Sequence, residues 1–256
     1  MKILNINVSE NATRHIKRLS DSFSKPVRFF PVEENPDKSG AGRSPAKTEN
    51  AEYYSVYLSR DLDKRIFEAN ALYELFYIIQ FESNFPALCN KKQRLFYEDG
   101  DFVEDLGRSL FTGILDIEIY DRLRECGYSD VVNTIADNVY NGLISNASNI
   151  RNNLDDKYSY ANLVITFAKV LFHTNREQDD NIKTLFGEYP FVLERSFSIR
   201  DSLRENHPDT PDSAVLAMGG VIDMFNLWDL FYIQTNKNRI RTKSEYNSFV
   251  GLRAAR

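Results

Sequence analysis

The stretch that decides the fold is Ala71-Leu72-Tyr73-Glu74-Leu75-Phe76-Tyr77-Ile78-Ile79-Gln80-Phe81-Glu82, followed by Asn84-Phe85-Pro86. Its apolar residues, continued upstream to Ile66, recur every three to four positions, which predicts one long helix. The proline and the residue before it disfavour the helical conformation, so the helix should end there. Asp61 or Asp63 is placed to cap its first turn.

Upstream of this helix, the sequence predicts one short helix and two strands. Residues Asn11 to Phe23 carry apolar side chains at amphipathic spacing and precede Pro26. Val27 to Val32 and Glu52 to Leu58 are rich in strand-forming residues. Between them, Glu33 to Asn50 is rich in Pro and Gly and almost free of apolar residues, which predicts a flexible loop over residues 33–50.

Downstream, helical periodicity dominates. A helix is expected over Val103 to Cys126, with Gly127 as its stop signal. Further helices are expected over Val131 to Ser145, Tyr160 to His173, Pro190 to Glu205 and Ser213 to Ile233. The order of elements predicts an α+β, mostly helical fold, with a first part over residues 1–130 and a helical C-terminal part over residues 131–256 that packs on the first as one unit.

Composition narrows the class of protein. A chain of 256 residues with 42% hydrophobic residues can bury a substantial core without disulfides. Cys89 and Cys126 lack CxxC spacing, which favours a reducing cytoplasm over a disulfide framework or a cysteine-rich zinc site. Met1 to Glu10 lacks the apolar core of a secretory signal, and polar residues interrupt the apolar stretches, so no membrane span is expected.

Charge argues against nucleic acid as the partner. The formal net charge is −5, which gives no general attraction to phosphate backbones. The best basic patch comprises Lys237, Arg239, Arg241 and Lys243. No stacking pattern of aromatic residues accompanies the patch, which is interpreted as a solvated tail.

The chemistry is concentrated in Tyr73-Glu74-Leu75-Phe76-Tyr77. An active zinc peptidase carries HExxH on a helix, because two histidines four residues apart face the same metal and the glutamate serves as general base. Here Glu74 is retained, and Tyr73 and Tyr77 occupy the positions of the two histidines. A strand that includes Tyr53, Tyr54, Val56 and Tyr57 precedes the helix, where a peptidase would hold an extended substrate.

With these flanks, the chain resembles the zincin-like metallopeptidases in which a helix of the type HELLHxxQxxEGFP follows a strand. Gln80, Glu82, Phe85 and Pro86 extend the match, and Arg122-Leu123 with Gly127-Tyr128 is similar to the later RL-x-x-x-G-[FY] run of that group. The resemblance covers about residues 50 to 130 and implies a minidomain of N-terminal helix, small sheet and active-site helix. In this group a second helix supplies the third ligand, and the matching residue is Asp116 or, as second choice, Glu118.

The departure from HExxH decides the expected function. A phenol, whose pKa is about 10, is a far poorer zinc ligand near pH 7 than a neutral imidazole. The remaining histidines, His15, His173 and His207, are distant from this helix in sequence. We therefore expect no zinc and no other cofactor, with Glu74 as a vestigial base, and a catalytically inactive protein that binds a peptide or protein partner.

Other interpretations remain open. Tyr73 and Tyr77 could be core aromatics, Glu74 could be solvated, and Asp116 and Glu118 could make ordinary contacts four residues along their own helix. The chain could also be an active enzyme, either a metallopeptidase with a non-standard site or a hydrolase that uses Glu74 with Asp116 or Glu118 as paired carboxylates. The zincin likeness could also be accidental, with the helical C-terminal part acting as a scaffold.

Overall fold

The computed structural model describes residues 1–34, 52–91, 97–145 and 157–254. The predicted loop over 33–50 lies outside these ranges from residue 35 onward. The chain divides into two compact units, one comprising residues 1–84 and 119–132 and the other residues 85–118 and 133–256. The sequence pattern instead placed one boundary near residue 130.

The first unit begins with a small hairpin and a capped helix. Strands β1 (Lys2–Ile3) and β2 (Ile6–Asn7) pair antiparallel, and the two residues between them have positive φ, as in a tight hairpin turn. Helix α1 (Glu10–Ser20) follows, and the side chain of its N-cap residue Ser9 accepts a hydrogen bond from the backbone N–H of Ala12. Its buried residues lie on one face, as the amphipathic spacing predicts.

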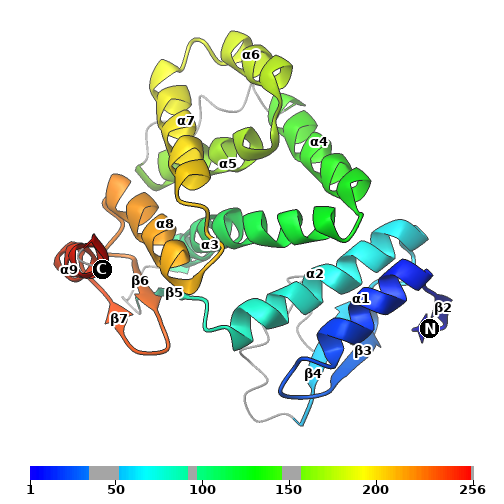
Figure 1. Ribbon diagram of the computed structural model, residues 1–256. Coiled ribbons are helices and arrows are strands. Elements are labelled where there is room, and N and C mark those ends of the chain that lie inside the picture. The colour runs from blue at the N-terminus through cyan, green and yellow to red at the C-terminus, as the bar shows by residue number, and fades with distance from the viewer. Residues whose placement is uncertain (35–51, 92–96, 146–156, 255–256) are drawn as a thin grey trace. The chain divides into compact units, whose positions relative to one another are not determined.

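A parallel strand pair lies beside two helices in the first unit. Strand β3 (Val27–Pro31), followed by the short 3-10 helix η1 (Val32–Glu34), pairs with β4 (Tyr54–Leu58). Helix α2 (Lys64–Glu82) packs against both α1 and β4 (Figure 1). Asp63 caps α2, which confirms one of the two predicted caps.

Helix α2 is apolar on nearly every side, as expected for a helix packed between other elements. Its buried residues are Phe67, Glu68, Ala69, Ala71, Leu72, Leu75, Phe76, Ile78 and Gln80. It ends at Glu82 with Ser83 as its C-cap, after which Asn84 has a positive φ of 60°. The predicted stop before Pro86 is therefore confirmed.

Helix α3 (Tyr97–Glu125) contributes to both units, and its last residues from 119 onward belong to the first. Gly127 has a φ of 86°, a conformation that suits glycine at the end of a helix. The Tyr128 N–H then donates to the Leu123 carbonyl at 2.9 Å. The predicted glycine stop is confirmed.

The second unit is built mainly of helices around one apolar core. After α4 (Ser129–Ser145), whose first residues belong to the first unit, the helices are α5 (Lys157–His173), α6 (Arg176–Leu185), α7 (Pro190–Glu205) and α8 (Pro211–Met224). Helices α5 and α7 pack closely on each other. The core draws on α3 and on α5 to α8, with Phe167, Phe186 and Met218 among its fully buried residues.

The C-terminal part is not entirely helical, so one sequence prediction is wrong. The helix expected over Ser213 to Ile233 ends at Met224, because Asn226 adopts a positive φ of 50° and breaks the helical path. Strand β6 (Phe231–Gln234) follows and pairs antiparallel with β5 (Ala87–Asn90) and β7 (Arg239–Ile240). Helix α9 (Lys243–Ala254) comes next.

Within the described ranges, no helix has the length and apolar character needed to cross a membrane.

Candidate functional site

The residues at the HExxH-like positions lie on the less buried side of α2. Tyr73, Glu74 and Tyr77 are each half-buried, whereas the neighbouring Leu72 and Leu75 are fully buried. The Tyr73 ring lies 6.2 Å from the ring of Tyr120, with an interplanar angle of 40°. Since Tyr73 and Tyr77 are four residues apart on a helix, they share a face, as the sequence predicts.

The two candidate acids belong to the second unit. Asp116 and Glu118 are both 5% exposed on α3. The Nζ atom of Lys169, on α5, lies 3.5 Å from Oδ2 of Asp116. The Asp116 carboxylate thus has a partner on another helix that spacing along α3 could not indicate.

Metal-binding side chains do not gather in the described part of the chain. No group of three or more His, Cys, Asp and Glu side chains within it is arranged to hold a metal ion. His15 lies on α1 with its Nδ1 atom 3.5 Å from Sγ of Cys126. Burial, together with the nearby Arg18 and Arg14, lowers the pKa of His15, and burial raises the pKa of Cys126. Both groups are therefore held neutral near pH 7.

The residues predicted to line the partner groove lie on two opposite faces of the β3–β4 sheet. Tyr54 and Val56 are 3% and 1% exposed and point toward α2, so a partner could reach only their main chain. Tyr53 and Tyr57 lie on the opposite side and are half-buried. Within β4 this alternation follows from the two-residue repeat of a strand, whereas Tyr53 lies in the bend that precedes β4.

The outer face of the sheet carries a row of aromatic rings. The Phe30 ring lies 6.1 Å from the ring of Tyr53 and 5.6 Å from that of Tyr57, with interplanar angles of 34° and 32°. The Arg28 guanidinium lies 4.0 Å from the centre of the Tyr53 ring. We call Phe30, Tyr53 and Tyr57 the aromatic row. The sequence indicated the two tyrosines but not Phe30 or Arg28.

A buried carboxylate on α2, absent from the sequence-based candidates, organises one end of the first unit. Glu68 is 2% exposed and accepts hydrogen bonds from the Ser9 N–H at 2.6 Å, the Ser9 hydroxyl at 2.9 Å and the Tyr128 hydroxyl at 3.0 Å. Burial and the contact with Glu68 raise the pKa of Tyr128 to about 12. The signal in the sequence was the position of Glu68 among the apolar residues near the start of α2.

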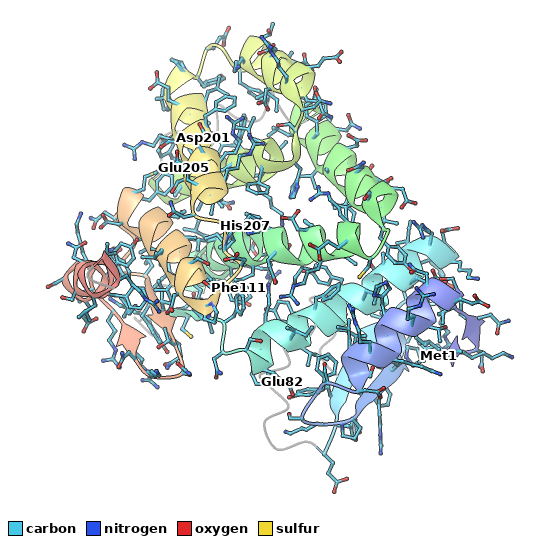
Figure 2. All side chains as sticks on the ribbon, in the orientation of Figure 1. Met1, Glu82, Phe111, Asp201, Glu205 and His207 are labelled. Atoms are coloured by element: carbon cyan, nitrogen blue, oxygen red, sulfur yellow. The ribbon has the colours of Figure 1, made fainter. Side chains whose placement is uncertain are left out.

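Glu82 repeats this arrangement near the C-terminal end of α2, where Figure 2 labels it. It accepts from the Ser24 N–H at 2.8 Å, the Ser24 hydroxyl at 2.5 Å and the Tyr54 hydroxyl at 2.8 Å. Burial works against ionisation of Glu82, but the bonds from Ser24 and Tyr54 outweigh it and lower its pKa. Each end of α2 is therefore tied to a serine beside α1 by a carboxylate that also binds a tyrosine.

Comparison of the chain with protein-family models, curated proteins and solved structures gave no match.

Proposed function

We propose that the chain is a catalytically inactive, metallopeptidase-like protein that binds a peptide segment of a partner on the outer face of the β3–β4 sheet. The observation that carries the proposal is the aromatic row, in which three half-buried aromatic side chains gather on one sheet face. Tyrosine and other aromatic side chains give large contact areas with little loss of rotamer freedom, so they dominate the binding energy of many interfaces.

The framework of the first unit supports binding by a preformed surface. Because Glu82 binds both Ser24, which precedes β3, and Tyr54 on β4, it fixes the inner side of the sheet to the end of α2. A sheet held in this way presents its outer side chains in fixed positions, which lowers the entropy lost on binding.

Selection from a random peptide library on the purified full chain tests the binding function. We expect enriched peptides whose binding is lost in Tyr53→Ala and Tyr57→Ala. Phe191→Ala is the matched control, because Phe191 is 47% exposed and stacks on Tyr160 in the second unit. Enriched peptides that bind both tyrosine variants unchanged would place the binding surface elsewhere.

The inactive, metallopeptidase-like part of the proposal rests on Tyr73 and Tyr77. Both occupy one face of α2 at the spacing of HExxH ligands, with Glu74 retained between them. Phenols bind zinc poorly at neutral pH, and without zinc no water is acidified for Glu74 to use.

Metal analysis by mass spectrometry tests this part. The chain should hold no stoichiometric zinc and cleave no peptide, whereas Tyr73→His with Tyr77→His should gain zinc affinity. Adding Asp116→Asn or Glu118→Gln to the double variant shows whether either acid is the third ligand. About one zinc per unmodified chain, or peptide hydrolysis lost in Glu74→Gln, would overturn the inactive assignment.

A further inference from the structure

We infer that the outer face of the β5–β6–β7 sheet binds an extended acidic segment of a partner protein, whose carboxylates pair with Arg239 and Arg241. This sheet belongs to the second unit, so the inference goes beyond the peptide binding proposed for the β3–β4 sheet of the first unit. It follows from the register of the sheet, the charge on its outer face and the spacing of the two arginines.

The sheet brings the basic run of residues 237–243 next to an aromatic ring. Strand β7 pairs with β6, with Arg239 opposite Gln234 (Figure 1). Tyr232 stands two residues before Gln234 on the same face of β6, and the Arg239 guanidinium lies 5.8 Å from the centre of its ring. Arg239 is therefore part of a sheet surface and not of the solvated tail that the sequence indicated.

The outer face follows from the two-residue repeat of the strands. Ile233 and Ile240 are 0% and 4% exposed and face the core, whereas Tyr232 is half-buried and Arg239 is exposed on the opposite side. Arg241 comes two residues after Arg239 and is exposed as well. Two guanidiniums and a tyrosine thus gather on one side of the sheet.

Electrostatics supports this placement of both arginines. The pKa of Tyr232 is raised, first by the hydrogen bond and the charge of the Cys89 thiol and then by burial, while the charges of Arg239 and Arg241 act in the opposite direction. Cys89 is opposite Tyr232 in the register of β5 and β6, so the three strands contribute to one surface. We call Cys89, Tyr232, Arg239 and Arg241 the basic face.

The positive charge of the basic face has no acidic partner within the described part of the chain. No ion pair there involves Arg239 or Arg241, whereas Lys243 of the same run lies 2.9 Å from the Asp223 carboxylate. The Glu245 carboxylate is occupied, because it accepts from the backbone N–H groups of Arg241 and of the next residue at 2.5 and 3.1 Å. In a chain of net charge −5, two such arginines on one face complement an acidic partner.

Arg239 is held in a position suited to a carboxylate. Its Nε atom donates to Oε1 of Gln234 at 2.7 Å, and its guanidinium lies over the Tyr232 ring. These contacts fix the side chain before binding, so less rotamer freedom is lost when a ligand arrives. The terminal nitrogens of a guanidinium can then hold a carboxylate in a bidentate manner.

The spacing of the two arginines selects an extended segment. Residues two positions apart on a strand lie about 7 Å apart on the same face. An extended acidic segment presents every second side chain on one face at the same spacing, so two carboxylates two positions apart meet Arg239 and Arg241 together. A helical segment does not match, because its side chains two positions apart do not face the same side.

Single-stranded nucleic acid also binds basic surfaces, but it stacks successive bases on aromatic rings along a basic groove. The basic face contributes a single ring, Tyr232, and Arg239 lies over it. The net charge of −5 also opposes a long polyanion. A short acidic segment therefore suits the basic face better.

Fluorescence anisotropy with the full chain tests the inference, with a labelled threonine-rich peptide that carries two aspartates two positions apart. Three labelled ligands are compared with it: the same peptide with the aspartates three positions apart, the same peptide with lysines for aspartates, and oligothymidylate. We expect the first peptide to bind about ten-fold more tightly than the other peptides, which lose one or both charge-assisted contacts. Oligothymidylate should also bind more weakly than the first peptide.

Charge variants test the two arginines. Arg239→Glu and Arg241→Glu should each weaken binding of the first peptide by about ten-fold or more. Arg176→Glu is the matched control, because Arg176 is exposed on α6 in the same unit and its replacement changes the net charge equally. The variant with both Arg239 and Arg241 replaced by glutamate should prefer the lysine peptide, which a folding defect could not cause.

Alkylation by iodoacetamide locates the bound peptide. Cys89 is half-buried on the basic face, whereas Cys126 is 5% exposed in the first unit and serves as the internal control. A saturating concentration of the first peptide should slow alkylation of Cys89 several-fold and leave Cys126 unchanged, and Arg239→Glu should remove this protection. Binding without protection of Cys89 would place the peptide elsewhere and overturn the inference.

The remaining outcomes identify other ligands. Equal affinity for the two spacings of aspartate, or an equal loss in Arg176→Glu, would show that net charge alone attracts the peptide. Tighter binding of oligothymidylate through the same arginines would make the ligand a nucleic acid. Displacement of the peptide by inorganic phosphate at equal concentration would mean that the basic face holds a single anion. Each of these results would overturn the inference.

Discussion

The Glu68 carboxylate accepts hydrogen bonds from both the backbone N–H and the hydroxyl of Ser9, at 2.6 and 2.9 Å. Ser9 is also the N-cap of α1, where its side chain accepts from the Ala12 N–H at 3.1 Å. One serine therefore starts α1 and anchors it to α2. Glu68 tolerates an exposure of 2% because three donors, including the Tyr128 hydroxyl, compensate for lost hydration.

Glu68→Gln should destabilise the first unit by about 2 to 4 kcal/mol. An amide keeps one acceptor oxygen and presents an N–H₂ group to donors that need acceptors, so at least one donor loses its partner. Hydrogen exchange at the backbone amides of Ser9 and Ala12 measures the effect locally. Glu125→Gln is the matched control, because Glu125 is exposed. Unchanged protection in the Glu68 variant would show that this network does not hold α1.

Tyr128→Phe should remove a contribution to stability that the unmodified chain loses only at high pH. The native pKa of Tyr128 is about 12, above the ordinary value of 10.0. A group with a raised native pKa stabilises the fold fully below its unfolded pKa and loses that contribution as pH rises through the native one. The stability difference between the unmodified chain and Tyr128→Phe should therefore shrink between pH 10 and about 12.

Urea unfolding followed by far-UV circular dichroism across that range measures this difference. At neutral pH the variant should be weaker by about 1 to 3 kcal/mol, since Glu68 loses one donor. A difference that stays constant up to pH 12 would contradict the assigned pKa.

The sequence correctly predicted most of the helix ends and strands, which depend only on residues close together in the chain. Asp63 caps α2, Gly127 ends α3, and β3 and β4 fall within the predicted strand ranges. Each depends on residues within one or two turns, which sequence alone contains. The apolar residues after Ser213 led to the wrong prediction of a helix as far as Ile233. A short apolar run does not distinguish a buried helix from a strand such as β6.

Tertiary partners could not be predicted in this way. Glu68 and Tyr128 are 60 residues apart, and Asp116 and Lys169 are 53 apart. No periodicity relates such positions, because their contact depends on how whole helices pack. Parallel pairing of β3 with β4, which brings Phe30 beside Tyr57, likewise needs the register of the sheet.

Glu82→Gln should make the first unit less dependent on pH in acid. The hydrogen bonds from Ser24 and Tyr54 hold the pKa of Glu82 below its ordinary value of 4.5. A group with a depressed native pKa stabilises the fold above its unfolded pKa and loses that contribution as pH falls through the native one.

The unmodified chain should therefore exceed Glu82→Gln in stability by about 1 to 2 kcal/mol at pH 7. The difference should fade below the ordinary pKa of glutamate, as the carboxylate is protonated. Urea unfolding at neutral and acidic pH measures it, with the exposed Glu52→Gln as control. An equal difference at both pH values would show that the charge of Glu82 does not matter.

The last prediction concerns the attachment of α9 to α8, where two adjacent glycines provide a matched pair. A Cβ atom at Gly219 would clash with the ring of Tyr246, whereas one at Gly220 would lie 3.7 Å from its hydroxyl, an ordinary contact. The Tyr246 hydroxyl donates to the Leu216 carbonyl at 2.9 Å, and its ring lies 5.6 Å from that of Trp228. The ring is therefore held on several sides and cannot move away without losing these contacts.

Gly219→Ala should destabilise the second unit by about 1 to 3 kcal/mol through overpacking. Gly220→Ala should be neutral or stabilising, because alanine favours a helix over glycine by about 1 kcal/mol. Trp228 is the only tryptophan, so its fluorescence reports on this contact and should shift to longer wavelength only in Gly219→Ala. Adding Tyr246→Ala to Gly219→Ala should cost less than the two single changes together, since the clash is then absent. Additive costs, or equal effects of the two glycine variants, would show that Tyr246 does not fix α9 to α8.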